Sequence, residues 1–344
     1  LLYSTLLGGP CYDRPSALAV GPDGTVWIAG ETDSDQFPLA WPLEGAPARG
    51  NYLSFVSAID PARGALRFST YLSLGANPAL AVGTDGGVWV AGATGSQAQT
   101  GSLIGSPFGF QTAPSDAFAG LISLPAAAPQ LNLTGVANAF SLLGGPVVPG
   151  EIVALTVPGF EPTAPVDLGF QNPAAAATTL GGAQVQFDGQ AAKLLSAVSG
   201  RLVAIAPTEL KPGAITSIQV MTAAGASNTI ASPVVASNPG LLSADGSGSG
   251  AALAWNADGS RNSPDNPAAP GSSIVVLATG VDASSAGATN YGTAPIAPVP
   301  GFAAGVYAVW ITVPSNPYYS HTPTVTLNAG SGPGMGQWLT VYLR

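Results

Sequence analysis

The side chains that could do acid–base or metal chemistry in this chain are few and scattered. His321 is the only histidine and Cys11 the only cysteine, so a zinc site with several His or Cys ligands is excluded. No Gly-x-Ser-x-Gly motif accompanies His321 to supply a nucleophile. The spacing of the five glutamates selects no pair of the kind that glycoside hydrolysis needs: Glu31, Glu44, Glu151, Glu161 and Glu209. We therefore predict that the protein is not an enzyme.

Oxygen ligands are dense in one stretch, NADGSRNSPDN at residues 256–266. Asp258 and Asp265, together with Asn262 and Asn266, could hold a calcium ion. Their spacing does not fit the EF-hand pattern, and clusters of Asp, Asn and Ser-Pro usually cap turns through their own backbone. The expectation is turn chemistry, with calcium near Asp258 and Asp265 as the alternative and no other cofactor.

Three aromatic residues near the C-terminal end could form a surface that stacks against sugar rings: Trp310, Tyr318 and Tyr319. The alternative, which we favour, is a core tryptophan with two tyrosines at its rim. Two Gly-rich stretches, residues 246–250 and 330–336, open no helix, so we predict flexible hairpin loops rather than phosphate-binding loops.

The composition predicts that these side chains are carried by short strands. The 344 residues include 45 Gly and 32 Pro, and only 8% are charged, against about 25% in typical soluble domains. Runs of Val, Ile, Thr and aromatic residues between Gly and Pro indicate many short strands joined by tight turns. The predicted fold class is therefore all-β.

Charge and composition also limit the partners and the location. The net charge is −9 and no basic stripe is present, which argues against nucleic acid. No apolar run reaches the ~18 residues that a transmembrane helix needs. Little Lys and Glu with abundant Gly, Ser, Thr and Ala favours a secreted or cell-surface protein. Cys11 is expected to be a small buried or half-buried thiol.

A 14-residue phrase occurs twice, as ALAVGPDGTVWIAG at residues 17–30 and as ALAVGTDGGVWVAG at residues 79–92. Each copy has two apolar runs around an Asp-Gly pair, which predicts a β-hairpin. Two-residue turns with positive φ at both central positions are predicted at the two Asp-Gly pairs: Asp23-Gly24 and Asp85-Gly86. The repeat predicts repeated sheets, as in a propeller.

Other segments repeat more weakly around these hairpins. Residues 3–5 (YST) return as residues 68–70 (FST), and residues 51–58 have an echo in residues 116–123, so each is predicted to be a strand. Trp27 and Trp89 occupy the same place in the two hairpins. Both are predicted to face inward and to fill space between neighbouring sheets.

The segments YSTLLGG, ALAVGPDGTVWIAGET and, more loosely, DAFAGLISL resemble the SBBP-type β-propeller repeat of bacterial secreted proteins. The resemblance implies about two propeller blades within residues 1–127. A propeller closes with roughly four to eight blades. Either further blades precede Leu1, or the two sheets pack on something other than a closed ring.

Residues 128–237 and 238–344 are predicted to be two β-sandwich domains. The segment PGEIVALTVPGF resembles the opening of an Ig-like domain. Together, GPVVPGEIVAL, TTLGGAQVQFDG, SNPGLLSADGSG and NADGSRNSPDNPAAPGS resemble the uncharacterised Solibacter-type C-terminal domain, which implies a secreted bacterial β protein without an assigned activity.

We expect strands in the first of these domains at residues 183–187, 193–197, 202–206, 215–222 and 230–235. In the second, we expect them at residues 250–256, 273–279, 306–313, 324–328 and 337–343. The stretch between Val281 and Val306 has little strand-forming sequence, so the second sandwich is expected to lack a strand or two and to expose an edge.

These observations favour an extracellular structural or adhesive protein that assembles into a homo-oligomer, filament or surface array by β-strand addition between subunits. The apolar, charge-free N-terminal segment is the candidate donor strand: Leu1, Leu2, Tyr3, Ser4, Thr5, Leu6 and Leu7. The alternative is a non-catalytic module that binds carbohydrate or another surface glycan, with Trp310, Tyr318 and Tyr319 as its aromatic contacts.

Overall fold

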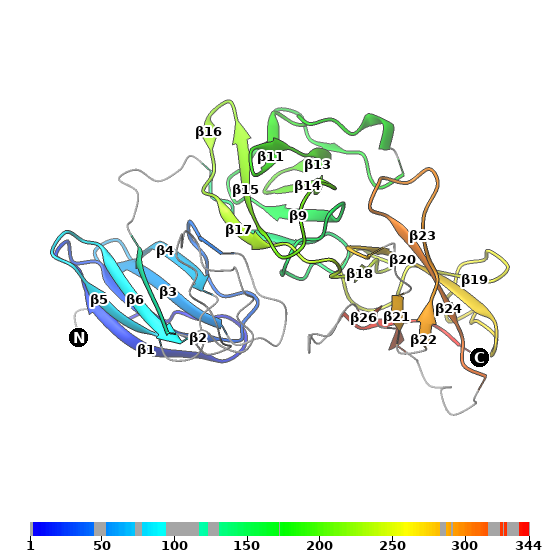
Figure 1. Ribbon diagram of the computed structural model, residues 1–344, viewed down its shortest axis with the longest axis horizontal. Helices are drawn as coiled ribbons and strands as arrows, with labels where there is room; N and C mark the ends of the chain where they lie inside the picture. Colours follow the sequence, from blue (N-terminus) through cyan, green and yellow to red (C-terminus); the bar gives the residue numbers. More distant parts are fainter. Residues whose placement is uncertain are drawn as a thin grey trace.

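The computed structural model describes residues 3–44, 53–72, 78–93, 117–122, 131–171, 173–282, 287–289, 292–315, 324–325, 327–328 and 337–343 (Figure 1). Every regular element in these ranges is a β-strand, apart from one 3-10 turn at Pro173–Ala175. The prediction of an all-β chain is confirmed. The sheets fall into three groups along the chain, drawn blue to blue-green, green to yellow-green, and yellow to red in Figure 1.

The N-terminal group consists of two antiparallel meanders, sheet 1 with four strands and sheet 2 with three. Their strands are β1 (Asp13–Val20), β2 (Val26–Thr32), β3 (Leu53–Asp60) and β4 (Ala65–Leu72) in sheet 1, and β5 (Ala79–Val82), β6 (Val88–Ala93) and β7 (Ala117–Ile122) in sheet 2. One hydrophobic core contains Trp27 and Phe68 from sheet 1 and Val88 and Ile122 from sheet 2, so the sheets pack face to face. Each copy of the repeated phrase thus contributes one hairpin to each sheet.

The repeated hairpins turn over three residues rather than the predicted two. In the first, Gly21 N donates to Thr25 O at 2.8 Å, and Gly24 alone takes a positive φ, of 81°. Asp23 keeps a negative φ, and its Oδ1 accepts a hydrogen bond from Thr25 N at 3.1 Å. A type I turn followed by a left-handed residue requires glycine only at the last of the three positions. The two-residue prediction was wrong because the side chain of Asp23 stabilises this longer turn.

The second hairpin repeats this geometry. Gly83 N donates to Gly87 O at 2.7 Å, and Gly86 has a φ of 83°. Asp85 Oδ1 accepts a hydrogen bond from Gly87 N at 3.1 Å. The two copies therefore share backbone geometry as well as sequence.

The third strands, β3 and β7, can be aligned through the residues that they pair with on β2 and β6. Gly30 lies opposite Phe55 on β3, and Gly92 lies opposite Phe118 on β7. Phe55 and Phe118 are therefore structural counterparts. The sequence match that aligned residues 51–58 with residues 116–123 is shifted by two residues relative to this structural alignment. A Cβ on Gly30 would lie 2.7 Å from Cε1 of Phe55, so glycine leaves room for the phenyl ring.

Within the described ranges, a fourth strand is present in sheet 1 only. Residues 68–70 belong to β4, which pairs with β3. Residues 3–5, their sequence counterpart, have no regular secondary structure. The prediction of a strand at residues 3–5 is therefore wrong within the single chain.

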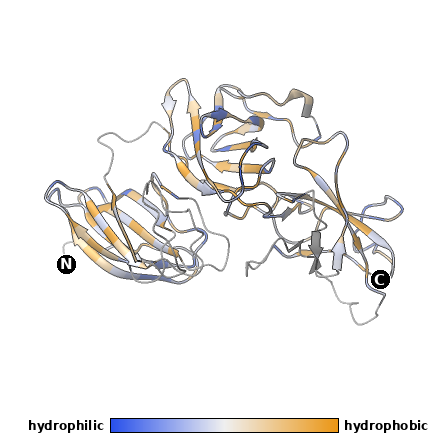
Figure 2. Ribbon diagram, in the orientation of Figure 1, coloured by the Kyte–Doolittle hydropathy of each residue, from blue (hydrophilic) through white to orange (hydrophobic). Residues whose placement is uncertain are grey.

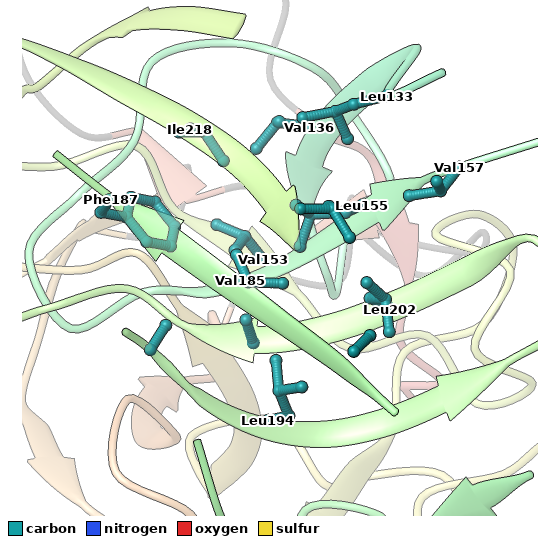
Figure 3. Packing of buried hydrophobic residues seen from close by; sticks show 14 of the residues in the cluster. Leu133, Val136, Val153, Leu155, Val157, Val185, Phe187, Leu194, Leu202 and Ile218 are labelled. Atoms are coloured by element: carbon teal, nitrogen blue, oxygen red, sulfur yellow. The ribbon is translucent and has the colours of Figure 1, made fainter. Parts of the chain in front are cut away.

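The central group is a pair of five-stranded antiparallel sheets that enclose one core (Figure 3). One sheet holds β10 (Val166–Asp167), β13 (Lys193–Val198), β14 (Arg201–Ile205), β9 (Ile152–Thr156) and β8 (Gly135–Asn138); the other holds β12 (Gln190–Ala191), β11 (Ala183–Phe187), β15 (Ile215–Thr222), β16 (Gly225–Ala226) and β17 (Ile230–Pro233). Leu155 and Leu202 from the first sheet and Phe187 and Ile218 from the second are fully buried between them. The five strands predicted here are found, two with matching bounds.

The C-terminal group contains one five-stranded sheet and two smaller ones. The largest holds β18 (Gly240–Leu241), β19 (Ala254–Asn256), β20 (Ser273–Thr279), β24 (Tyr307–Thr312) and β23 (Ile296–Pro298); the others hold β22 (Gly292–Ala294), β21 (Gly287–Thr289) and β26 (Leu327–Asn328), and β25 (Thr324–Val325) and β27 (Leu339–Thr340). Three short strands, β21 to β23, lie between Val281 and Val306. The expectation that this stretch forms little strand was wrong, because backbone pairing of β21 with β26 and of β23 with β24 forms short strands despite a weak hydrophobic pattern. That this domain lacks strands and exposes an edge stays a prediction.

The three groups contact one another. Trp41 N donates to Asn132 Oδ1 at 3.0 Å, and Ala231 N donates to Leu43 O at 3.0 Å, which joins the N-terminal sheets to the central pair. The central and C-terminal groups share a hydrophobic cluster: Ala139, Phe140, Ile152, Ala154, Leu195, Val203, Leu277, Ala303 and Val306.

Candidate functional site

The two N-terminal sheets are stacked in the same sense, which defines a front and a back face for each. The back face of sheet 1 carries Trp27, Ala29 and Phe68. It packs on the front face of sheet 2, which carries Leu80 and Val90 along with other apolar residues. The internal contact is therefore back to front between two copies of one repeat. The strands of both sheets carry many hydrophobic residues (Figure 2).

Equivalent residues of the repeat differ sharply in exposure. Trp27 on the back of sheet 1 is 2% exposed, because the front of sheet 2 covers it. Trp89, its counterpart on the back of sheet 2, is 52% exposed, and Leu121 beside it is 50% exposed. The prediction that both tryptophans face a neighbouring sheet is correct for Trp27 and wrong for Trp89. The back of sheet 2 is a tryptophan-bearing face without a cover among the described residues.

The front of sheet 1 is partly open as well. Leu18 and Val20 on β1 are 66% and 60% exposed, whereas their counterparts Leu80 and Val82 on sheet 2 are half-buried against sheet 1. The open back of sheet 2 is thus equivalent to the covered back of sheet 1, and the open front of sheet 1 is equivalent to the covered front of sheet 2. Sequence periodicity marked all these residues as apolar strand positions, but it could not tell which copy is covered.

The other half of this front face is closed by a loop. Phe37 packs on Phe55 with ring centroids 4.4 Å apart, and Leu7 and Leu39 join this cluster. Tyr71 OH donates to Ser34 O at 2.7 Å and accepts from Phe37 N at 2.9 Å. Burial raises the pKa of Tyr71, which stays a neutral hydrogen-bonding group. The open part of the front face is therefore confined to β1 and β2.

The predicted donor segment lies beside this face. Leu1 and Leu2 lie outside the described residues, and residues 3–6 are exposed. Leu6 is 99% exposed, while Leu7 is half-buried on the front of sheet 1. The segment is apolar, exposed and unpaired with any strand in the described part of the chain.

A cleft of about 720 Å³ lies where the three groups of sheets meet. Gln36 from the N-terminal group, Thr134 from the central group, and Ser247 and Trp338 from the C-terminal group contribute to its lining. Trp338 is 58% exposed. No local sequence pattern points to this tryptophan, because the residues that share its cleft come from three distant segments.

The predicted aromatic surface is placed only in part. Trp310 is on β24 and is 38% exposed, so it is neither fully buried nor free on the surface. Tyr318 and Tyr319, like His321, lie outside the described residues. Trp310 does not line the cleft with Trp338.

The Asp/Asn loop of the C-terminal group makes turn hydrogen bonds. The Ser260 hydroxyl donates to Asp258 Oδ1, and Ser260 N donates to the same oxygen at 2.9 Å; both hydrogen bonds lower the pKa of Asp258. Asn262 Nδ2 donates to Asn256 Oδ1 at 2.9 Å, and Asn266 Nδ2 donates to Ser260 Oγ at 2.7 Å. These contacts agree with the turn interpretation. Within the described ranges, no three His, Cys, Asp or Glu side chains gather in a way that could hold a metal ion near Asp258 or elsewhere.

Cys11 differs from expectation, because it is exposed rather than buried. It precedes β1 in a segment whose backbone is bound to polar side chains: Cys11 N donates to Ser34 Oγ at 3.0 Å. A small apolar residue in a short irregular segment leaves no periodicity from which its burial could be predicted.

One buried carboxyl group stands out in the central group. Glu151 is 2% exposed; its oxygens accept hydrogen bonds from Asn138 Nδ2 at 2.7 Å and Val148 N at 2.8 Å. Burial raises the pKa of Glu151 to about 8 despite these two donors. Asn138 also reaches Asn238 O at 3.3 Å, so the pair lies against the C-terminal group. These hydrogen bonds join the central group to the start of the C-terminal group.

Among the described residues, no helix has the length and apolar content to cross a bilayer. No protein-family model matches the chain, and no curated protein matches it. Two solved structures overlap with it loosely. A mixed-linkage glucan utilization locus protein of Bacteroides ovatus, SGBP-B, solved in complex with a mixed-linkage heptasaccharide, has a TM-score of 0.30 and 11% identity, over 99% of this chain and 67% of that one. A gamma-CGTase from alkalophilic Bacillus clarkii has a TM-score of 0.22 and 11% identity, over 95% of this chain and 38% of that one. At these TM-scores neither likeness bears on fold or function.

Proposed function

We propose that this protein is an extracellular structural or adhesive protein that assembles head to tail through its N-terminal sheets. In this proposal the front of sheet 1 of one copy packs on the back of sheet 2 of the next. The N-terminal sheets are propeller-type blades that do not close a ring, and the two domains after them are Ig-like sandwiches. The bacterial, secreted origin implied by the SBBP and Solibacter resemblances is part of the same proposal.

The observation that carries this proposal is the contrast between Trp27 and Trp89. The chain already contains one back-to-front contact, in which Trp27 is buried. The same two kinds of face remain open at the ends of the pair, with Trp89 and Leu121 on one and Leu18 and Val20 on the other. Large exposed apolar faces on a folded protein mark interaction sites. A contact between two different faces is heterologous and propagates as a filament if its rotation does not close.

The proposal is tested by replacing Trp89 with lysine and imaging the protein by negative-stain electron microscopy. We expect linear assemblies for the wild-type chain and single particles for Trp89→Lys. Burying the lysine charge in the contact would cost more free energy than the apolar contact contributes. Trp338→Lys is the matched control, since Trp338 is a similarly exposed tryptophan in another group and should leave the assemblies intact. Equal assembly by both variants would contradict the proposal.

A second candidate function, carbohydrate binding, has support from the cleft at the junction of the three groups. Its exposed Trp338 ring stands among hydroxyl and amide side chains, a combination suited to stacking on and hydrogen bonding to a sugar ring. If this function holds, Trp338→Ala should weaken binding of an oligosaccharide at least ~10-fold by calorimetry, as for other aromatic anchors. Trp310→Ala is the control and should leave the affinity unchanged; an unchanged affinity for Trp338→Ala would rule this cleft out.

A further inference from the structure

We infer that residues 3–7 form the missing fourth strand of sheet 2 in a second copy of this chain. The inference rests on the proposed head-to-tail assembly and deepens it, because it names the acceptor strand and the pairing register. The acceptor is β7, which pairs only with β6 in the described part of the chain.

The strand count of the two sheets points to this acceptor. Sheet 1 has β4 beside β3, whereas sheet 2 ends at β7, the counterpart of β3. The sequence counterpart of β4 residues 68–70 is residues 3–5, which have no strand partner in the single chain. Among the described residues, the edge of sheet 2 lacks one strand, and residues 3–5 are an unused copy of it.

Chain order decides which sheet the unused strand joins. β4 comes directly before β5 in sequence, yet it belongs to sheet 1, whose back face covers the front of sheet 2. By the same rule, the segment before β1 belongs to the sheet whose back covers the front of sheet 1. The proposed assembly places sheet 2 of the next copy in that position.

The position of residues 3–7 favours pairing with β7 of a second copy over pairing with β7 of the same chain. Leu7 packs with Phe55 and Tyr71 on the front of sheet 1. Sheet 2 of the same chain covers the opposite, back face. The chain therefore leaves Leu7 on the side away from its own β7. Leu72, the counterpart of Leu7, likewise faces the front of the next sheet.

The register follows from the pairing of β3 with β4. Phe68 lies opposite Ala58, and Thr70 lies opposite Val56. Trp27 lies opposite Ala58 and Trp89 opposite Leu121, so Leu121 is the counterpart of Ala58 and Ala119 that of Val56. Transfer of this register places the donor residues opposite three acceptor residues: Tyr3 opposite Leu121, Ser4 opposite Gly120, and Thr5 opposite Ala119.

This register would cover side chains that are exposed in the single chain. Tyr3 would lie on the back face near Trp89, as Phe68 lies 6.1 Å from Trp27 between ring centroids. Leu6, 99% exposed, would occupy the place that Tyr71 holds at 0% exposure in sheet 1. Strand addition supplies backbone hydrogen bonds, while these side chains fix the register.

Cysteine cross-linking tests the pairing. In a Cys11→Ser background, which removes the exposed native thiol, the variant Thr5→Cys with Ala119→Cys should give a ladder of disulfide-linked multimers on mild oxidation. The matched control is Thr5→Cys with Ala117→Cys, because Ala117 is an exposed alanine on the same face of β7 two residues away. We expect at least a ~10-fold lower cross-linked fraction for the control, since only directly opposite residues meet disulfide geometry.

The outcomes separate this inference from the proposed function. Mixing a Thr5→Cys chain with an Ala119→Cys chain should give dimers only when both are present, which supports pairing between copies. A monomer with an internal cross-link would overturn pairing between copies, because residues 3–7 would then pair with β7 of the same chain. Assemblies that form without either cross-link would overturn the strand pairing and leave the face contact standing. A protein that stays monomeric would overturn both.

Discussion

Trp27→Ala should lower the free energy of opening of the N-terminal sheet pair by about 3–5 kcal/mol, whereas Trp89→Ala should change it by less than about 0.5 kcal/mol in the single chain. The two tryptophans occupy the same position of the repeat and the same place in their hairpins. Trp27 fills the core between the sheets, so its loss leaves a cavity. No sheet of the described part of the chain lies against the ring of Trp89, which is 52% exposed, so its loss removes little packing.

Hydrogen exchange followed by mass spectrometry is the suitable measurement, because a chain with several domains does not unfold in one two-state transition. Peptides from β2 and β6 should lose most of their protection in Trp27→Ala and keep it in Trp89→Ala. The comparison must be made at high dilution, where any assembly has dissociated. Equal loss of protection in both variants would show that Trp89 is already covered within the chain and would remove the basis of the proposed contact.

Glu151 should make the protein less stable as the pH rises from about 4.5 to about 8. The pKa of this carboxyl is about 8 in the folded chain and near its ordinary 4.5 in the unfolded chain. Between these values the folded state binds the proton and the unfolded state does not, so stability is full below pH 4.5 and falls up to pH 8. The expected slope is about 1.4 kcal/mol per pH unit.

Glu151→Gln should remove this slope, because glutamine does not titrate. Glu209→Gln, at an exposed glutamate, is the matched control and should retain it. The measurement is the protection of peptides from β9 and β20 against pH. These strands meet at this site, where Ile152 N donates to Thr279 Oγ1 at 2.9 Å. Identical pH profiles for the wild-type chain and Glu151→Gln would show that burial of Glu151 does not control the contact between the central and C-terminal groups.

Strand positions could largely be predicted from the sequence, because alternation and turn residues are local signals. β15 (Ile215–Thr222) and β20 (Ser273–Thr279) have the predicted bounds. The signal weakens where strands are short and poor in large apolar residues, as in β21 (Gly287–Thr289). The hairpin turns were mispredicted by one residue because Asp23 stabilises a longer turn with its side chain, a choice that the Asp-Gly pair alone leaves open.

The sequence identified residues of the candidate site but not which of them are exposed. The repeat identified Trp27 and Trp89 as equivalent, but equivalence in sequence carries no information on which copy has a neighbour. Exposure of Leu18, Trp89 and Leu121 depends on how many sheets stack, which is a property of the whole molecule. The cleft around Trp338 and the burial of Glu151 likewise arise from contacts between distant segments, so no local sequence pattern predicts them.

The molar mass of the intact wild-type protein, measured by light scattering over a wide concentration range, tests the central claim most directly. A chain whose two end faces fit one another should give a mass that climbs steadily above the 33.9 kDa of one copy as concentration increases. A mass that stays at 33.9 kDa throughout, up to roughly millimolar protein where even weak contacts form, would contradict it.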